Sequence, residues 1–208
     1  AVRRICVGAP RRGRAGPAES DSGACAAASR PTLGRGAAAR RAMPAVPGYT
    51  HLSRVGEGTY GVVYSARDER TGAVVALKRL RSPEAADGLT QAAAREMRAL
   101  QRLRGATGVV RLLRVVAGER ERDGSASLFL ALEWAPFDLG RVLDAAPRPF
   151  DVAAAKRVAQ GVLAAVDACH AAWTLHRDVK ASNVLLTEAG GVRLCDFGLA
   201  RTFGAGGG

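Results

Sequence analysis

From Tyr49 onward, the apolar residues fall into segments of strand or helix length that are separated by turn-forming residues. Two apolar, β-branched segments flank a glycine-rich turn at residues 56–61, and another strand follows the turn at residues 69–72. Two more strands are predicted at residues 109–117 and 127–134, on either side of a charged turn. The pattern therefore predicts a sheet of five strands.

Two segments show the spacing of apolar residues that is typical of helices with one buried face. Residues 90–103 form the first, with Thr90 as the expected N-cap and Glu96 as its only acidic residue. Residues 151–170 form the second, with Asp151 as the expected N-cap. The apolar positions that we expect to be buried are Met97, Leu100 and Leu103 in the first helix, and Val152, Val158, Val162, Leu163 and Val166 in the second.

Polar side chains surround a predicted β-hairpin near the C-terminal end of the sequence. Its two short apolar runs, at residues 184–186 and 192–194, are joined by a turn that contains two glycines. Because a hairpin brings its ends together, we expect Asp178, Asn183 and Asp196 to converge on one small volume. Their carboxylate and amide oxygens suit Mg²⁺, which shares a few such ligands with a phosphate-bearing substrate.

Most of the positive charge lies at the N-terminal end. The formal net charge is +12, and residues 1–44 contain nine arginines against two acidic residues, Glu19 and Asp21. These residues include almost no large apolar side chains, so we expect a disordered tail. Its composition also fits an organelle transit peptide or a nucleic-acid-binding arm. The remaining residues carry only +5, and nucleic acid is therefore expected as a partner only through this tail.

Cysteine usage and hydropathy predict an intracellular protein. The four cysteines are scattered, with no CxxC motif and no histidines at metal-ligand spacing, which favours neither a disulfide framework nor a zinc site. They are Cys6, Cys25, Cys169 and Cys195. No apolar run approaches the roughly 20 residues that cross a bilayer, and no secretory signal is recognisable. We expect no membrane association and a location in the nucleus or the cytoplasm.

The glycine-rich turn has the spacing GxGxxG, formed by Gly56, Gly58 and Gly61. This spacing alone is also found in dinucleotide-binding folds. Here, however, Gly61 leads into the strand-like residues 62–64 rather than into a helix, and there is no GK[ST] ending of a Walker A loop. Glycines between two strands allow backbone N–H groups to approach phosphates closely. The turn therefore predicts a phosphate-binding loop.

Two motifs at the C-terminal end narrow the chemistry. HRDVKASN at residues 176–183, followed by DFG at residues 196–198, resembles the catalytic and magnesium-binding loops of protein kinases. Upstream, Lys78 follows the glycine-rich turn at the end of an apolar strand, as the phosphate-binding lysine of kinases does. A lysine in that place needs a carboxylate partner, and we expect Glu96 to be that partner.

The resemblance implies a role for each polar residue and a requirement for ATP and Mg²⁺. Asp178 would be the catalytic residue that orients the substrate hydroxyl and accepts its proton, and Lys180 would neutralise the γ-phosphate. Asn183 and Asp196 would hold Mg²⁺, while Lys78 would hold the α- and β-phosphates. The HRDxK form is more similar to serine/threonine kinases than to tyrosine kinases, so the implied substrate is a protein Ser/Thr hydroxyl.

The same resemblance implies how the nucleotide lies. Leu132 would be the gatekeeper, the backbone of Glu133 and Ala135 would face the adenine edge, and Asp138 would lie on the ribose side. The apolar residues around the adenine ring would be Val55, Val63, Ala76 and Leu185, and the glycines over the phosphates Gly56, Gly58 and Gly61.

The implied fold is α+β and protein-kinase-like. After the tail at residues 1–44, residues 45–135 would form an N-lobe with a five-stranded antiparallel sheet and one helix. Residues 136–208 would form the hinge and the start of a helical C-lobe that is truncated after DFG. We therefore expect an N-terminal fragment that lacks most of the C-lobe.

Within protein kinases, GEGTYGVVY, CHAAWTLHRDVK and DFGLARTFG resemble the cyclin-dependent kinase family. This implies a cyclin that docks on the helix at residues 90–103 and moves Glu96 toward Lys78. Thr59 and Tyr60 would be inhibitory phosphorylation sites, because phosphates there would lie against those of ATP. The family's cyclin-contacting signature is replaced here by TQAAARE, which leaves open which cyclin binds.

Three interpretations of function remain open. The first is a cyclin-dependent-kinase-like Ser/Thr kinase, of which Arg95, Arg177 and Arg201 match the arginines that would clasp an activating phosphothreonine. The second is a truncated, non-catalytic kinase that binds nucleotide or a cyclin. The third is a nucleic-acid-binding protein that acts through residues 1–44.

Overall fold

The fold was determined as a computed structural model, which describes residues 45–204 apart from residues 59–60, 81–89, 121–125 and 147. The predicted tail and the predicted phosphorylation sites Thr59 and Tyr60 lie outside the described residues. The described residues all belong to one compact unit. The boundaries proposed between tail, N-lobe and C-lobe stay predictions.

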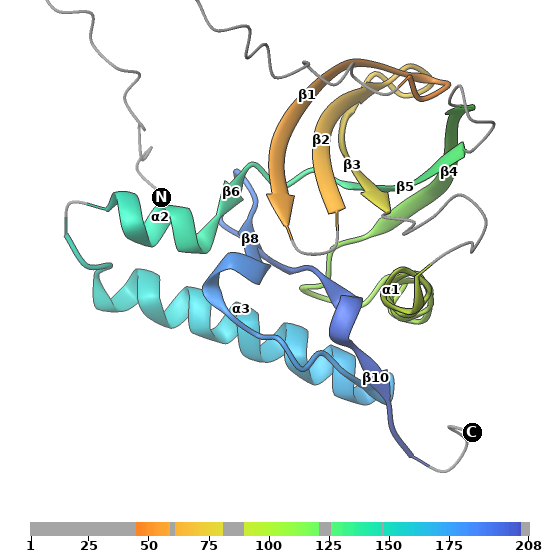
Figure 1. The fold of residues 1–208 in the computed structure, drawn as a ribbon. Helices are drawn as coiled ribbons and strands as arrows, with labels where there is room; N and C mark the ends of the chain where they lie inside the picture. The colour runs from red at the N-terminus through yellow and green to blue at the C-terminus, as the bar shows by residue number, and fades with distance from the viewer. Residues whose placement is uncertain (1–44, 59–60, 81–89, 121–125, 147, 205–208) are drawn as a thin grey trace, which may run out of the picture. The chain divides into compact units, whose positions relative to one another are not determined.

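Five antiparallel strands form one curled sheet (Figure 1). Their order is β1-β2-β3-β5-β4, so β5 lies between β3 and β4. The strands are β1 (Tyr49–Gly58), β2 (Gly61–Asp68), β3 (Val74–Leu80), β4 (Leu112–Arg120) and β5 (Ala126–Glu133). The five-stranded sheet that was predicted from the spacing of apolar segments is confirmed.

Side chains on the two faces of this sheet enter two separate cores, because successive residues of a strand point to opposite faces. Leu77 and Phe129, both fully buried, belong to a core that also contains Tyr49 and Tyr64. Leu130, one residue after Phe129, belongs instead to the larger core that extends into α1 and the C-terminal elements. The sheet is thus apolar on both faces.

The strand that was predicted at residues 109–117 begins later, at Leu112, and runs to Arg120. The reason is that residues 108–110 pair elsewhere, with β9 (Val192–Leu194). Val109 forms a parallel bridge with Leu194, whose N–H donates to the Gly108 carbonyl (2.7 Å). The Val110 N–H donates in turn to the Leu194 carbonyl (3.0 Å). Local alternation could not reveal this pairing, which joins segments more than 80 residues apart.

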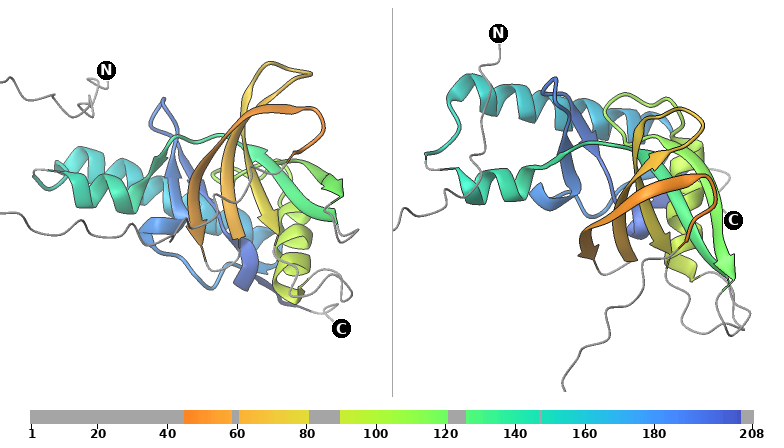
Figure 2. Two further views of the ribbon diagram at one scale, coloured as in Figure 1. Left: turned by 45° about the horizontal axis from the view of Figure 1, so that its top comes forward. Right: turned by 90° about the horizontal axis from the view of Figure 1, so that it is seen from above.

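Helix α1 (Gln91–Arg102) lies beside the curled sheet and packs against η2 (Phe197–Leu199) (Figure 2). The predicted N-cap is confirmed, because the Thr90 hydroxyl accepts a hydrogen bond from the Ala93 N–H (3.1 Å). Leu100 and Leu103 are buried as expected, and Met97 is half-buried against the same core.

The C-terminal elements are short strands and turns supported by two helices. A three-stranded sheet has the order β6-β8-β9, and β10 pairs with β7. The hairpin predicted at residues 184–194 is confirmed as β8 and β9. The elements not yet bounded are β6 (Phe137–Asp138), α2 (Leu139–Ala145), α3 (Val152–Ala171), β7 (Thr174–Leu175), η1 (Ala181–Asn183), β8 (Val184–Leu186) and β10 (Arg201–Thr202). No helix within the described residues is long and apolar enough to cross a membrane.

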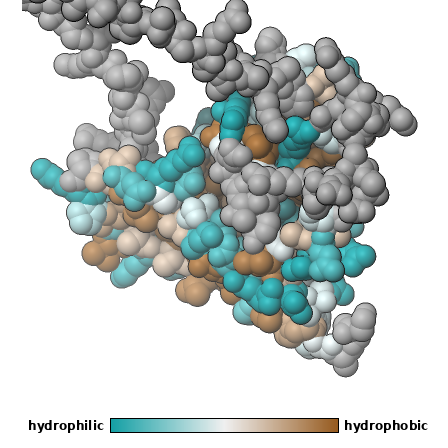
Figure 3. Space-filling model, in the orientation of Figure 1, coloured by the Kyte–Doolittle hydropathy of each residue, from teal (hydrophilic) through white to brown (hydrophobic). Residues whose placement is uncertain are grey.

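Helix α3 buries a narrower face than its sequence predicts. Its N-cap is correct, since the Asp151 carboxylate accepts from the Ala154 N–H (2.6 Å). Val152 and Leu163, however, are 71% and 67% exposed, while the small residues Ala165 and Cys169 are buried. The helix packs on β9 and β7, and Val158, Val162 and Val166 are half-buried against the larger core. Figure 3 shows hydrophobic surface along the edge formed by α2 and α3.

The contact between α3 and β9 depends on a glycine. A Cβ added to Gly161 would lie 2.6 Å from Val192 Cγ2 and 2.8 Å from Val192 Cβ. We therefore expect Gly161→Ala to lower the free energy of unfolding by about 1–2 kcal/mol, although alanine favours helix. The effect is measured by urea unfolding. In a Val192→Gly background, which removes both of these Val192 atoms, the same substitution should be neutral or stabilising; an equal loss in both backgrounds would refute the packing explanation.

Candidate active site

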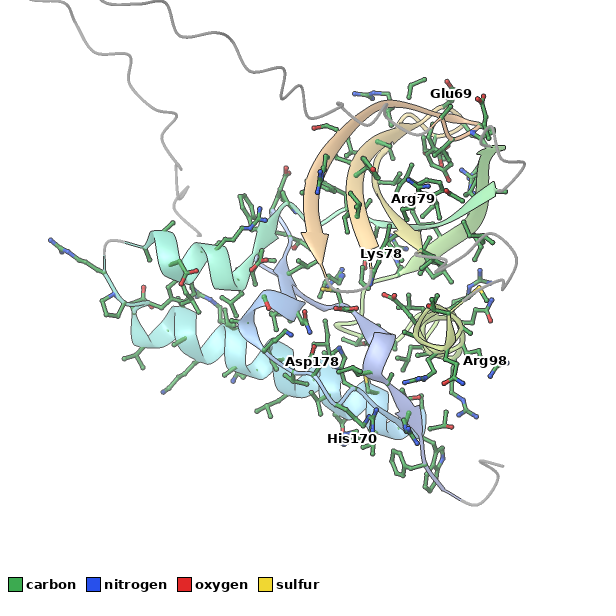
Figure 4. All side chains as sticks on the ribbon, viewed as in Figure 1. Glu69, Lys78, Arg79, Arg98, His170 and Asp178 are labelled. Carbon is green, nitrogen blue, oxygen red and sulfur yellow. The ribbon has the colours of Figure 1, made fainter. Side chains whose placement is uncertain are left out.

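A buried lysine, Lys78, which Figure 4 labels, lies between two carboxylates that come from different parts of the chain. Lys78, on β3, is 8% exposed, and its Nζ lies 2.6 Å from Glu96 Oε1 and 2.9 Å from Asp196 Oδ1. Glu96, on α1, is 2% exposed. The ion pair predicted between Lys78 and Glu96 is therefore confirmed. The contact of Lys78 with a second carboxylate, that of Asp196, was not predicted.

The two carboxylates keep Lys78 charged. Burial by itself lowers the pKa of Lys78, but Glu96 and Asp196 outweigh that effect and raise the pKa above its ordinary value. A lysine that is permanently charged and held by two elements presents a fixed positive charge to the space beside it. Such a charge is suited to bind phosphate.

Asp178 forms the centre of a second polar cluster. The Asn183 amide Nδ2 donates to the Asp178 carboxylate (Oδ2, 2.9 Å) and to the Asp178 backbone carbonyl (2.8 Å). The ammonium group of Lys180 lies 2.9 Å from the same carboxylate oxygen. These bonds hold the pKa of Asp178 below its ordinary value, and the bond from Lys180 has the largest effect. The carboxyl group of Asp178 is therefore ionised near neutral pH.

The residues predicted to hold Mg²⁺ have the chemistry that this ion requires. Because Asn183 donates both hydrogen bonds through Nδ2, its remaining polar atom is the carbonyl oxygen Oδ1. Asp196 is held near Asn183 by the residue before it, since the Cys195 N–H donates to the Asn183 carbonyl (2.9 Å). Among the described residues, no group of three His, Cys, Asp or Glu could hold a metal. Mg²⁺ would therefore complete its shell with water and phosphate oxygens, as it commonly does.

His176 positions Asp178, a role that the sequence interpretation missed. Its Nδ1 accepts a hydrogen bond from the Asp178 N–H (3.2 Å), so the proton lies on Nε2, which donates to the Cys195 carbonyl (2.9 Å). The ring also packs edge-on against Phe197 (4.6 Å between centroids). His176 thereby joins the segments that carry Asp178 and Asp196. The sequence feature that could have indicated this role is the position of His176, two residues before Asp178.

His176 also predicts how stability depends on pH. Burial lowers its pKa below the ordinary 6.5, despite the neighbouring carboxylates of Asp196 and Asp178. The unfolded chain therefore binds this proton more readily than the folded protein. The contribution of His176 to stability is complete above pH 6.5 and is lost as the pH falls through its folded-state pKa.

The prediction is measured by urea unfolding between pH 7.5 and 5.5. His176→Gln should reduce the loss of stability across this range. Equal pH dependence in the parent and in His176→Gln would contradict the prediction.

Several residues predicted to surround the nucleotide share one face of the sheet. Val63 pairs with Lys78, and Ala76 pairs with Leu132. Directly paired residues of antiparallel strands lie on the same face, as do residues two apart, so all four flank the same surface. Leu132 is buried, while Val63 and Ala76 are half-buried. Val55 is 39% exposed.

The other residues that were predicted to contact the nucleotide also form contacts within the fold. The Glu133 N–H donates to the Arg111 carbonyl (3.0 Å), and the Glu133 carboxylate pairs with Arg193 (2.9 Å) and Arg111 (3.4 Å). Asp138 is the N-cap of α2, because its Oδ1 accepts from the Arg141 N–H (3.1 Å). Ala135 is buried, and Leu185 is half-buried beside Asp138. Neither the ion pairs nor the cap was predicted.

Strand packing requires one of the glycines of the glycine-rich turn, Gly61. Gly56 and Gly58 end β1 opposite Val63 and Gly61. A Cβ at Gly61 would collide with the Arg79 carbonyl of the adjacent strand. Glycine is thus required here for strand packing, whatever its role toward phosphate.

The three arginines predicted to clasp a phosphothreonine lie on three segments. Arg95, on α1, donates to Gln91 (3.3 Å). Arg177 has a left-handed backbone (φ 68°) and donates to the Leu199 carbonyl (2.7 Å). Arg201 is exposed on β10, which contacts α1. Their common role stays a prediction.

The comparison with known proteins agrees with this geometry. Residues 49–207 match the protein kinase domain. The match covers most of the chain, which therefore belongs to the protein kinase family. Together with the five-stranded antiparallel sheet, it confirms the predicted α+β, protein-kinase-like fold.

Within this family the chain is cyclin-dependent-kinase-like. Cyclin-dependent kinase 10 of Rattus norvegicus and that of Homo sapiens are each 40% identical over 156 residues, which are 75% of this chain and 42% of theirs. Cyclin-dependent kinase G-1 of Oryza sativa subsp. indica is 36% identical over 157 residues, 76% of this chain and 22% of that protein. The chain thus spans less than half the length of these relatives.

Proposed function

We propose that this protein is an ATP-dependent, cyclin-dependent-kinase-like serine/threonine kinase that transfers the γ-phosphate of ATP to a hydroxyl of a protein substrate. The observation that carries the proposal is the buried Lys78, held between Glu96 and Asp196. A buried lysine with two carboxylates is costly to maintain. Its retention is explained if the fixed charge binds the phosphates of a nucleotide.

The second polar cluster supplies the groups for transfer. Asp178, ionised and oriented by Asn183, accepts the proton of the attacking hydroxyl. Lys180, whose side chain is 54% exposed, would turn from Asp178 toward the transferred phosphate. Mg²⁺ bound to Asn183 and Asp196 would neutralise charge on the phosphate oxygens.

The nucleotide would lie on the sheet face that Val63, Ala76 and Leu132 share. The Glu133 N–H is already used by Arg111, so the carbonyl of Glu133 is the group left for the adenine edge. A cyclin would dock on α1, and since α1 carries Glu96, this docking would control the pair with Lys78. We place the enzyme inside the cell, in the nucleus or the cytoplasm, where ATP and protein substrates are found.

Isothermal titration of the full chain with ATP, in the presence and absence of Mg²⁺, tests the first part of the proposal. We expect Mg²⁺-dependent binding that Lys78→Met weakens at least ten-fold, because a desolvated charge-assisted contact is lost. Arg79→Met, the adjacent strand residue, is the matched control. Transfer from labelled ATP to Ser/Thr peptides, with and without added cyclin, tests the second part.

Absence of nucleotide binding would refute the proposal. Nucleotide binding without transfer under any condition would favour the alternative, a non-catalytic kinase that binds nucleotide or a cyclin.

A further inference from the structure

The outward face of α1 carries positive charge without a matching acid. Arg95, Arg98 and Arg102 follow the i, i+3, i+7 spacing of one helical stripe. Arg98 and Arg102 are exposed, and Arg95 is half-buried. Figure 4 shows Arg98 projecting away from the sheet. The only acid of the helix, Glu96, is buried on the opposite face and already paired with Lys78.

Three arginines elsewhere in the described chain have carboxylate partners. Arg111 and Arg193 pair with Glu133, and Arg114 pairs with Asp68 (2.7 Å). In contrast, none of the three α1 arginines forms an ion pair with a described carboxylate; Arg95 donates to the neutral Gln91.

The helix dipole explains only part of the pattern. A cation in the last turn is favourable there, which accounts for Arg102. Arg95 and Arg98 lie too far from the C-terminus of the helix for this effect. No carboxylate of the described residues neutralises their charge.

An exposed aromatic pair lies beside the stripe. Strand β10 contacts α1 and pairs with β7. Just beyond these strands, the Phe203 N–H donates to the Trp173 carbonyl (3.1 Å), and the two rings lie 5.3 Å apart. Trp173 and Phe203 are 57% and 38% exposed. Aromatic side chains next to arginines are the composition typical of the centre of protein interfaces.

We propose that the α1–β10 surface, formed by Arg95, Arg98, Arg102, Trp173 and Phe203, binds an acidic partner protein with an apolar anchor site. This inference rests on the proposed function and specifies it: the cyclin that docks on α1 is one whose docking face is acidic. Charge complementarity of this kind selects the partner and accelerates association. A helix of 12 residues is only about 18 Å long, which suits a protein patch better than an extended nucleic acid.

The test uses the full chain and three purified cyclins chosen by the charge of the cyclin box, one acidic, one near neutral and one basic. Association rates and Kd are measured by surface plasmon resonance at 50 and 300 mM salt. We expect the acidic cyclin to bind tightest and to lose affinity with salt. Arg98→Glu and Arg102→Glu should each slow its association roughly ten-fold. Arg157→Glu, the same change at an exposed position of α3, should have little effect.

Mg²⁺-ATP affinity, measured on every variant, separates this inference from the proposed function. Loss of cyclin binding with intact nucleotide binding supports the acidic-partner inference. Equal effects of Arg98→Glu and Arg157→Glu, tighter binding of the basic cyclin, or no cyclin binding at all would overturn it. So would retained cyclin binding combined with loss of binding to a labelled oligonucleotide, which would assign the stripe to nucleic acid. Failure of nucleotide binding in the parent chain would instead refute the kinase proposal.

Discussion

Asp178→Asn is expected to reduce phosphoryl transfer by about 10²- to 10⁴-fold, the range found when a positioned general base is removed. Asparagine has nearly the shape of aspartate, and the Asn183 amide can still donate to its carbonyl oxygen. It cannot accept a proton from the attacking hydroxyl. Mg²⁺-ATP affinity should therefore change little, because no nucleotide contact is assigned to Asp178.

Single-turnover transfer to a Ser/Thr peptide measures the first quantity, and isothermal titration measures the second. Asp167→Asn is the matched control, since it makes the same chemical change at an exposed position of α3. Transfer that persists at the parental rate in Asp178→Asn would remove Asp178 from the mechanism. A parallel loss in Asp167→Asn would show that the effect is one of folding.

The second large effect concerns the buried ion pair. Glu96→Gln keeps the volume of the side chain but leaves Lys78 with one carboxylate, from Asp196, which is 25% exposed. Breaking a buried pair typically costs about 3–5 kcal/mol. We expect a loss near the lower end of this range, because Asp196 remains as a partner.

Urea unfolding gives the free energy for a cycle of substitutions. The double variant Lys78→Met, Glu96→Leu should recover most of the loss, since neither charge is then buried. Arg111→Ala, which removes an ion pair of an arginine that is 63% exposed, should cost no more than about 1 kcal/mol. A double variant as unstable as Glu96→Gln would mean that packing, rather than charge, explains the effect.

Local patterns in the sequence were sufficient for the five-stranded sheet and for the caps formed by Thr90 and Asp151, because each depends on residue spacing along one element. The pair of Lys78 with Glu96 was expected from the resemblance to protein kinases. Some missed contacts are local, such as that of His176 with Asp178, but the ion pairs of Glu133 depend on partners far apart in the chain. Glu133 and Arg193 are 60 residues apart, and nothing in their local sequence distinguishes them from solvated charges.

Val152 and Leu163 of α3 were wrongly predicted to be buried, whereas Val158, Val162 and Val166 pack against the core as expected. Apolar spacing shows which side of a helix is able to be buried, but the packing of its neighbours determines how much is buried. Ala165 lies directly against Gly108, and Gly161 against Val192, so the helix is held closely along its small residues. Val152 and Leu163 lie off this line of contact and remain exposed.

The pairing of residues 108–110 with β9 affects how the protein loses its structure. This segment enters β4 directly, so the large sheet and the C-terminal hairpin share a continuous run of backbone hydrogen bonds, reinforced by Glu133 and Arg193. Neither region can separate without breaking bonds that stabilise the other. The two regions should therefore melt as one cooperative unit, and amide protons in β5 and β9 should exchange with solvent through the same global opening.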